Sequence, residues 1–302
     1  MTRTDFRQAS GKKRGGYSTG QLFNFAQDSY FERTSRPVYA AVFLLPFIIF
    51  YEVGTLLINT DVLNRSQVRV VAFVWLQDAL EFIGFSNKFA WAAPALVVLV
   101  ILIALQLTSA KKWKVYAGDF WVMGAECVVL ALPLIVLTLF LNTTSGSGGE
   151  VSGAGAGHTA VCAAVAGQGA AECQSVVVSG GSIFANIVAG IGAGIYEELV
   201  FRLILIVLLM LLFQDFLLFE HGLSVVLSVA VSAALFSAHH HIVFVGGHLE
   251  MSAPFTFGEF AFRTLAGVYF ACLFAIRGFG ITAGTHAFYD IIAVLVNAIF
   301  FA

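Results

Sequence analysis

Three charged residues interrupt an apolar stretch of the sequence that reads "GIYEELVFRLILI". They are Glu197, Glu198 and Arg202. Glu198 and Arg202 are four residues apart, so on a helix they share a face and can form an ion pair. Glu197 is rotated by about 100° from Glu198 and has no partner within its own helix. A carboxylate without a partner is suited to act as a general base, whereas a buried ion pair that holds helices together is the purely structural explanation of the same residues.

Histidines occur in two further apolar stretches. In "AALFSAHHHIVF", His240 follows Phe236 by four residues, and the three adjacent histidines would point in three directions around a helix. In "GITAGTHAFYDIIAVLV", His286 and Asp290 are four residues apart and share a face. Such residues are often hydrogen-bonded structural groups, and adjacent histidines also suit a metal site or an interfacial cluster. Three polar sets in one C-terminal group nevertheless favour their convergence with Glu197 around one buried cavity.

The composition indicates that these stretches are membrane helices. Of the 302 residues, 59% are hydrophobic and 11% are charged, and the mean hydropathy is +0.88. A net charge of -2 argues against a nucleic-acid partner. We therefore expect an all-α polytopic transmembrane bundle, because a span needs roughly 20 apolar residues. The expected spans are 38–58, 89–107, 120–141, 183–213, 223–245, 260–276 and 281–302. Residues 68–85 predict an interfacial helix, or an eighth span if they cross.

The distribution of Lys and Arg predicts the organisation of the chain. Residues 1–36 form a basic tail, 37–141 hold the N-terminal spans, and 142–182 are rich in Gly, Ala and Ser and contain no Lys or Arg. Basic segments favour the cytoplasmic side. We therefore predict a multi-pass inner-membrane protein with a cytoplasmic N-terminus and a flexible extracytoplasmic loop. Cys162 and Cys173 share this loop and are either a disulfide or two free thiols.

The expected helices leave one geometric difficulty. His240 lies near the end of the fifth span and His286 near the start of the seventh, and these spans run in the same direction. Their depths differ by about 12 residues, about 18 Å at the rise of an α-helix. A shared site therefore requires shifted boundaries, strong tilts or a broken helix. We expect the fifth helix to continue past His240, as far as about Val245.

The three motifs together resemble the CPBP family, whose name joins CAAX prenyl proteases and bacteriocin-processing enzymes and which comprises intramembrane glutamic endopeptidases. The motifs read "EELVFR", "FSAHH" and "HAFYD" and lie in order on separate expected spans. The resemblance covers residues 183–302, which it makes the catalytic transmembrane core. Residues 1–182 carry no motif of the family.

The resemblance implies a metal-independent endopeptidase without a cofactor. Glu197 would activate water, His240 would assist it, and His286 and Asp290 stand where the family places oxyanion-stabilising groups. Asp290 replaces the Asn of the prenyl-protease branch and cannot donate a hydrogen bond when ionised, so we expect it to orient His286. The supporting residues would be Glu198, Arg202 and Phe236.

The expected partners are the lipid bilayer and a membrane-associated protein or peptide substrate. The sequence contains no HExxH zinc motif, and no GxGD or GxSG motif lies in an expected span. Two alternatives remain open. One is a metal-dependent membrane hydrolase with Glu197, His240 and His286 as ligands. The other is a non-enzymatic scaffold or immunity protein whose polar residues only hold helices together.

Overall fold

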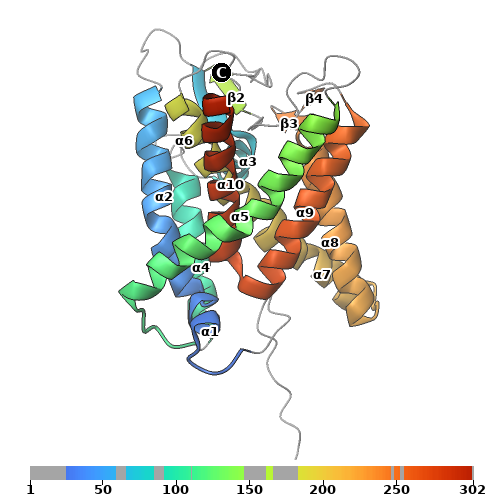
Figure 1. Ribbon diagram of the computed structural model, residues 1–302. Coiled ribbons are helices and arrows are strands. Elements are labelled where there is room, and N and C mark those ends of the chain that lie inside the picture. Colours follow the sequence, from blue (N-terminus) through green and yellow to red (C-terminus); the bar gives the residue numbers. More distant parts are fainter. Residues whose placement is uncertain are drawn as a thin grey trace, which may run out of the picture.

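A computed structural model gives the fold, which consists mainly of helices (Figure 1). It describes residues 25–58, 66–84, 92–109, 111–145, 161–165, 183–245, 248–251 and 255–300. The helices are α1 (Tyr30–Thr34), α2 (Pro37–Ile58), α3 (Val71–Phe82), α4 (Ala93–Thr108), α5 (Ala117–Ser145), α6 (Ile183–Glu198), α7 (Ile206–Met210), α8 (His221–Ala238), α9 (Phe257–Arg277) and α10 (Phe279–Phe300). The π-helical segment η1 (Leu199–Leu205) joins α6 to α7, and a second one, η2 (Leu211–Phe216), continues the same rod after α7.

Six helices in the described part of the chain are long and apolar enough to cross a membrane, and α4 is a shorter apolar helix of 16 residues. This confirms the prediction of a polytopic helical bundle, and the chain is an integral, multi-pass membrane protein. The weaker stretch predicted at 68–85 contains the helix α3. The fourth expected span is a single run of 34 residues, Ile183–Phe216.

Helix α10 lies at the centre of the bundle. In its apolar window 67% of the residues are buried, against 22–33% in the other five spans. It packs against α6 at two glycines, and a Cβ atom at Gly194 would lie 2.5 Å from the backbone nitrogen of Ala287. A Cβ atom at Gly190 would lie 2.6 Å from Cβ of Asp290. The absence of these side chains lets the two helix axes approach closely, as glycines four apart do in membrane helices.

Helix α8 ends at Ala238, so the prediction that it continues to Val245 is wrong. Its last turn tightens, because the backbone nitrogen of His240 binds the carbonyl of Ser237 at 3.3 Å instead of that of Phe236. His239 and His240 therefore lie in a turn, and the strand β3 (Ile242–Val245) follows and pairs antiparallel with β4 (His248–Met251).

A second antiparallel pair joins β1 (Ser66–Val70) to β2 (Val161–Val165), at the end of the bundle near the C-terminus (Figure 1). The strand β2 is the only part of residues 146–182 within the described residues, so the rest of the predicted flexible loop, with Cys173, lies outside the described residues. Residues 1–24 of the basic tail lie outside them as well.

The described part of the basic tail folds against the opposite end of the bundle (Figure 1). Lys112 and Arg36 form ion pairs with Asp28 at 2.5 and 2.9 Å, and their hydrogen bonds hold the pKa of that carboxyl below its usual range. Arg277 at the end of α9 pairs with Glu126 of α5 at 2.6 Å and donates to Thr34 of α1 at 2.9 Å. These contacts place both basic segments, the tail and residues 111–114, at one end.

Candidate active site

The two glutamates end the last turn of α6, and both are almost completely buried. Neighbouring residues on a helix point in different directions, and these two serve different partners. Glu198 faces Arg202 and α10, whereas Glu197 faces the turn that follows α8. The close approach of α6 to α10 at Gly194 brings Glu198 to His286.

Glu198 links two nitrogen-containing side chains, those of Arg202 and His286. Its Oε2 atom lies 3.1 Å from Nε of Arg202, as the spacing of four residues predicted. Its Oε1 atom lies 2.7 Å from Nδ1 of His286. The Arg202 guanidinium is fully buried, lies 4.0 Å above the ring of Phe236 and donates to the carbonyl of Gly267 at 3.3 Å. The buried charge of Arg202 is thus neutralised by Glu198 and shielded by an aromatic face.

His286 lies between two carboxylates. Its Nε2 atom is 3.7 Å from Oδ2 of Asp290, and its ring stacks on Phe270 with centroids 4.5 Å apart. A carboxylate accepts hydrogen bonds, so both nitrogens of His286 are placed as donors. Asp290 therefore lies where it can orient this imidazole, while Glu198 binds its other nitrogen.

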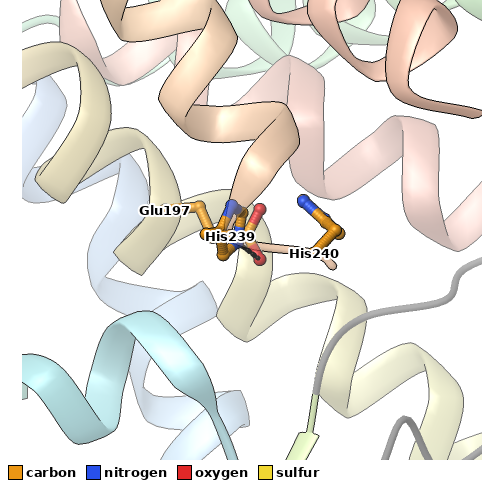
Figure 2. Close-up of side chains that lie close together, drawn as sticks. All are labelled: Glu197, His239 and His240. Carbon is orange, nitrogen blue, oxygen red and sulfur yellow. Dashed lines mark ion pairs between the residues drawn. The ribbon is translucent and has the colours of Figure 1, made fainter. Parts of the chain in front are cut away.

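Glu197 faces two histidines, from the turn that follows α8, rather than one (Figure 2). Nε2 of His239 lies 3.6 Å from Oε1 of Glu197, and one ligand atom from each of Glu197, His239 and His240 falls within 4.8 Å of the others. The sequence assigned His240 to the site through its spacing from Phe236 but did not assign His239. The structure adds His239, whose Nε2 atom lies within ion-pair distance of Glu197.

The backbone carbonyl of Phe236 holds both imidazoles. Nδ1 of His239 binds this oxygen, and Nδ1 of His240 binds it at 2.9 Å. In a regular helix the backbone N–H of His240 would bind the Phe236 carbonyl. Here that N–H binds the carbonyl of Ser237, so the Phe236 oxygen is available to the side chains. A carbonyl oxygen only accepts, so each Nδ1 atom carries its proton. Each Nε2 atom of a neutral imidazole then presents a lone pair.

The ring of Phe236 connects the two groups of the site. Its centroid lies 5.2 Å from the ring of His240 and 6.0 Å from that of His286. Phe236 lies about two turns further along α8 than His286 lies along α10, and their rings are nevertheless in contact. The residue of α8 that meets His286 is therefore Phe236, one turn before His240.

Several buried polar atoms of the site have no hydrogen-bond partner within the described residues. They include Oε1 of Glu197, Nε2 of His239 and Oδ2 of Asp290. Buried polar atoms are normally satisfied by protein or by water. Oε1 of Glu197 and Nε2 of a neutral His239 are both acceptors, and a water molecule between them would donate to both. The arrangement can therefore hold and deprotonate water, or hold a cation through the same atoms.

The remaining intramembrane carboxylates have other contacts. Glu52 of α2 accepts a hydrogen bond from Tyr196 at 3.2 Å, and Glu126 pairs with Arg277. Among the described residues, Glu197 with its two histidines is the group of acidic, histidine or cysteine side chains placed to hold a metal ion.

A comparison with known protein families agrees with this geometry. The family described as type II CAAX prenyl endopeptidase Rce1-like matches residues 179–292, which contain all three motifs. Neither a curated protein nor a solved structure matches the chain. The match coincides with the region from α6 to α10 that builds the site. Residues 179–292 therefore match the Rce1-like type II CAAX prenyl endopeptidase family, which agrees with the resemblance of the motifs to CPBP proteases.

Proposed function

We propose that this chain is an intramembrane endopeptidase that hydrolyses a peptide bond of a membrane-associated protein or peptide with water activated by Glu197. The observation that carries the proposal is the buried pair of Glu197 and His239 beside His240, whose facing atoms have no hydrogen-bond partner among the described residues. The family match supports a protease but leaves the mechanism and the substrate to this proposal.

The proposed reaction begins with a water molecule held by Glu197, His239 and His240. Glu197 takes one proton from the water, and the hydroxide formed attacks the scissile carbonyl carbon. His286 then donates a hydrogen bond to the oxyanion from Nε2, which faces Asp290 before the reaction, while Glu198 holds its ring through Nδ1. The tetrahedral intermediate collapses as protonated Glu197 gives its proton to the leaving amine. A positioned base contributes about 10²–10⁴-fold and an oxyanion donor about 10²–10³-fold.

The ends of the bundle support the predicted topology. The basic tail and residues 111–114 meet at one end, joined by Lys112 and Asp28, and basic segments favour the cytoplasm. We place the N-terminus in the cytoplasm and the protein in the inner membrane. A reporter enzyme that is active only outside the cytoplasm should then be active when it is fused after Ala302.

The test uses substrate trapping, because the substrate is not specified by the site. The native protein and the Glu197→Gln variant are expressed at equal levels, and membrane peptides and co-purifying proteins are identified by mass spectrometry. We expect new peptide termini with the native protein, their loss with Glu197→Gln, and uncleaved substrate bound to the variant. Glu220→Gln, at an exposed position before α8, is the matched control and should cleave normally.

The outcome separates this proposal from the scaffold alternative. A folded Glu197→Gln protein that still generates the same termini would disprove glutamate-activated hydrolysis. A scaffold role would be favoured by two results together. No new peptide termini would depend on the native protein, and Glu197→Gln would change the association of the helices.

A metal-dependent hydrolase is the second candidate, favoured by the ligand atoms within 4.8 Å. Its ligand set differs from the one that the sequence suggested, because His286 binds Glu198 and is outside this group.

A further inference from the structure

We infer that Arg263 of α9 determines substrate specificity, because its guanidinium is placed to bind a carboxylate of the substrate beside the catalytic residues. This inference rests on the proposed function, since it assigns part of the substrate of that same site. The carboxylate is either the C-terminal one of the substrate or the side chain of an Asp or Glu.

The first support is the face of α9 on which Arg263 lies. Arg263, Gly267 and Phe270 are four and then three residues apart, so they share one face of the helix. The carbonyl of Gly267 accepts a hydrogen bond from Arg202 at 3.3 Å, and the ring of Phe270 stacks on that of His286 at 4.5 Å. Arg263 therefore continues the face of α9 that covers the site.

The second support is the level of Arg263 along the bundle. The antiparallel helices α8 and α9 lie side by side (Figure 1). A Cβ atom at Gly267 would lie 3.0 Å from Cα of Ala233, and the hydroxyl of Ser237 donates to the carbonyl of Phe260 at 2.8 Å. Arg263 lies between Phe260 and Gly267 on α9. It is therefore level with the last turn of α8, after which the histidines of the site follow.

The third support is that the charges around Arg263 belong to the same site. Its guanidinium interacts electrostatically with Glu197 of α6 and with Tyr289 of α10. It is also one of the charges that act on His240, in the turn after α8. Three other elements that build the site thus face this cation of α9, and an anion bound to it would lie beside the catalytic residues.

The fourth support is the unused hydrogen-bonding capacity of the guanidinium. Arginine carries five N–H donors. Nη1 of Arg263 lies 3.7 Å from Oε2 of Glu259, which is longer than a hydrogen bond. Nη1 is buried and has no hydrogen-bond partner among the described residues. The side chain is nevertheless 16% exposed, so a ligand can reach it.

The shape and charge of the guanidinium select the ligand. Its planar pair of N–H groups matches the two oxygens of a carboxylate, and such charge-assisted hydrogen bonds are stronger than neutral ones. Glu259 is then the counter-ion of Arg263 in the absence of substrate, and the substrate carboxylate replaces it. A weak ion pair between these two residues, without any role in binding, is the purely structural explanation of the same contact.

The test measures the binding of synthetic peptides to the full chain in detergent micelles. The Glu197→Gln background keeps bound peptides intact. The probes are short fluorescent peptides of Leu, Ala and Val with one common sequence. One has a free C-terminal carboxylate and one has a neutral C-terminal amide. A third set has the amide and a single Asp, placed at each position in turn. Fluorescence anisotropy gives the dissociation constants.

Three variants separate binding from structure. Arg263→Gln removes the cation, Arg263→Lys keeps a charge without the planar pair of donors, and Glu259→Gln removes the competing carboxylate. Lys114→Gln is the matched control, because it removes one positive charge at an exposed position, at the end of the bundle that holds the basic tail. Thermal unfolding of each variant shows whether it remains folded.

We expect an acidic peptide to bind about tenfold or more tightly than the neutral one. Arg263→Gln should abolish this preference without weakening the binding of the neutral peptide, and Arg263→Lys should retain part of it. Glu259→Gln should strengthen the binding of the acidic peptide, and Lys114→Gln should change nothing. A preference for the free C-terminus would identify the terminal carboxylate as the ligand, and a preference for Asp would identify a side chain.

Equal binding of acidic and neutral peptides, or no binding of either, would overturn the assignment. A preference that survives in folded Arg263→Gln would do the same. If Arg263→Gln does not fold, the other two variants decide, because an unchanged preference in both Arg263→Lys and Glu259→Gln would leave only the structural explanation.

Cleavage by the chain with native Glu197 then tests the link to the proposed function. For a trapped substrate that carries the carboxylate, Arg263→Gln should raise KM about tenfold or more and change kcat little. A carboxylate preference in binding without any cleavage would leave the anion site standing and count against the proposed function. Cleavage that depends on Glu197 but has the same KM in Arg263→Gln would do the reverse.

Discussion

Nδ1 of His286 lies 2.7 Å from Oε1 of Glu198, which joins two residues 88 positions apart on the central pair of helices. The neighbouring Glu197 instead faces His239 across 3.6 Å. The paired glutamates therefore divide their tasks, with one built into the packing of α6, α9 and α10 and the other directed at the histidines of α8. This division gives the two positions different responses to substitution.

Loss of Glu198 should unfold the protein, whereas loss of the Glu197 charge should not. Glu198→Leu leaves the fully buried Arg202 without its counter-ion, and breaking such a pair costs about 3–5 kcal/mol. Thermal unfolding in detergent should show a large decrease in the midpoint for Glu198→Leu and a small change for Glu197→Gln.

The double variant Glu198→Leu/Arg202→Met provides the control for that cost. It removes both charges, so it should recover part of the stability lost in Glu198→Leu. Equal stability of Glu198→Leu and the native protein would contradict the assignment of Glu198 as the counter-ion of Arg202.

Gly194→Ala should separate α6 from α10. The added methyl group would lie 2.5 Å from the backbone nitrogen of Ala287, which cannot move aside as a side chain can. We expect a loss of about 1–3 kcal/mol from overpacking, together with reduced cleavage, because Glu198 and His286 would be displaced. Unfolding and cleavage assays measure the two effects.

Gly124→Ala is the matched control, since a methyl group there meets no atom within 4 Å. It should leave cleavage unchanged and stabilise α5 by at most about 1 kcal/mol through helix propensity. Similar losses for both substitutions would argue against close packing of α6 and α10 at Gly194.

Replacing His239 or His240, in the turn after α8, should reduce the rate of catalysis. His239→Asn and His240→Asn each remove a lone pair from the group around Glu197, and we expect each to lower kcat at least 10²-fold if the residue assists the base. His221→Asn should retain the native rate. Full activity of His239→Asn in a folded protein would leave His240, the residue identified from the motif, as the sole partner of Glu197.

Chelation of divalent cations should not abolish cleavage. In the proposed reaction the base is Glu197 itself, so treatment with EDTA should leave the rate unchanged. Substrate cleavage before and after removal of the metal is the measurement. A complete loss that returns on addition of Zn²⁺ would show that hydrolysis depends on the metal.

Arg277→Lys should weaken the attachment of the N-terminal segment. Arg277 binds Glu126 through Nε and a terminal nitrogen at 2.6 and 2.8 Å and also contacts Thr34. Lysine has no planar pair of donors, so we expect a loss of about 2 kcal/mol. A double-mutant cycle with Glu126→Gln checks this, because the coupling between Arg277 and Glu126 should account for most of the loss.

Much of the fold and part of the site could be predicted from the sequence because local spacing determined them. The apolar runs located the membrane helices, and the spacing of four residues predicted the Glu198–Arg202 pair. These features depend on one helix at a time. The contact between Glu198 and His286 depends on the rotation of α6 against α10, which no local spacing determines.

The end of α8 shows why the rest could not be predicted. The expected helix passed through the three histidines because the stretch stays apolar to Val245. In the structure the imidazoles of His239 and His240 take the Phe236 carbonyl and the helix stops at Ala238. The backbone N–H of His240 and the Nδ1 atoms of His239 and His240 compete for the Phe236 carbonyl, and the side chains bind it. This competition determines where α8 ends. The adjacent histidines were the available signal for His239, but helical geometry assigned them to different directions.

The π-helical segment η1 begins directly after Glu198. A π turn contains about one residue more than an α turn, and such bulges arise within otherwise α-helical rods. Deletion of a single residue of η1 after Arg202 would convert the segment to an ordinary α turn and preserve both the phase of the glutamates with the helix before them and the spacing of Glu198 from Arg202. The same deletion within α6 would swing Glu197 and Glu198 by about 100° relative to the preceding glycines. The rod thus tolerates a change of chain length on only one side of its carboxylates.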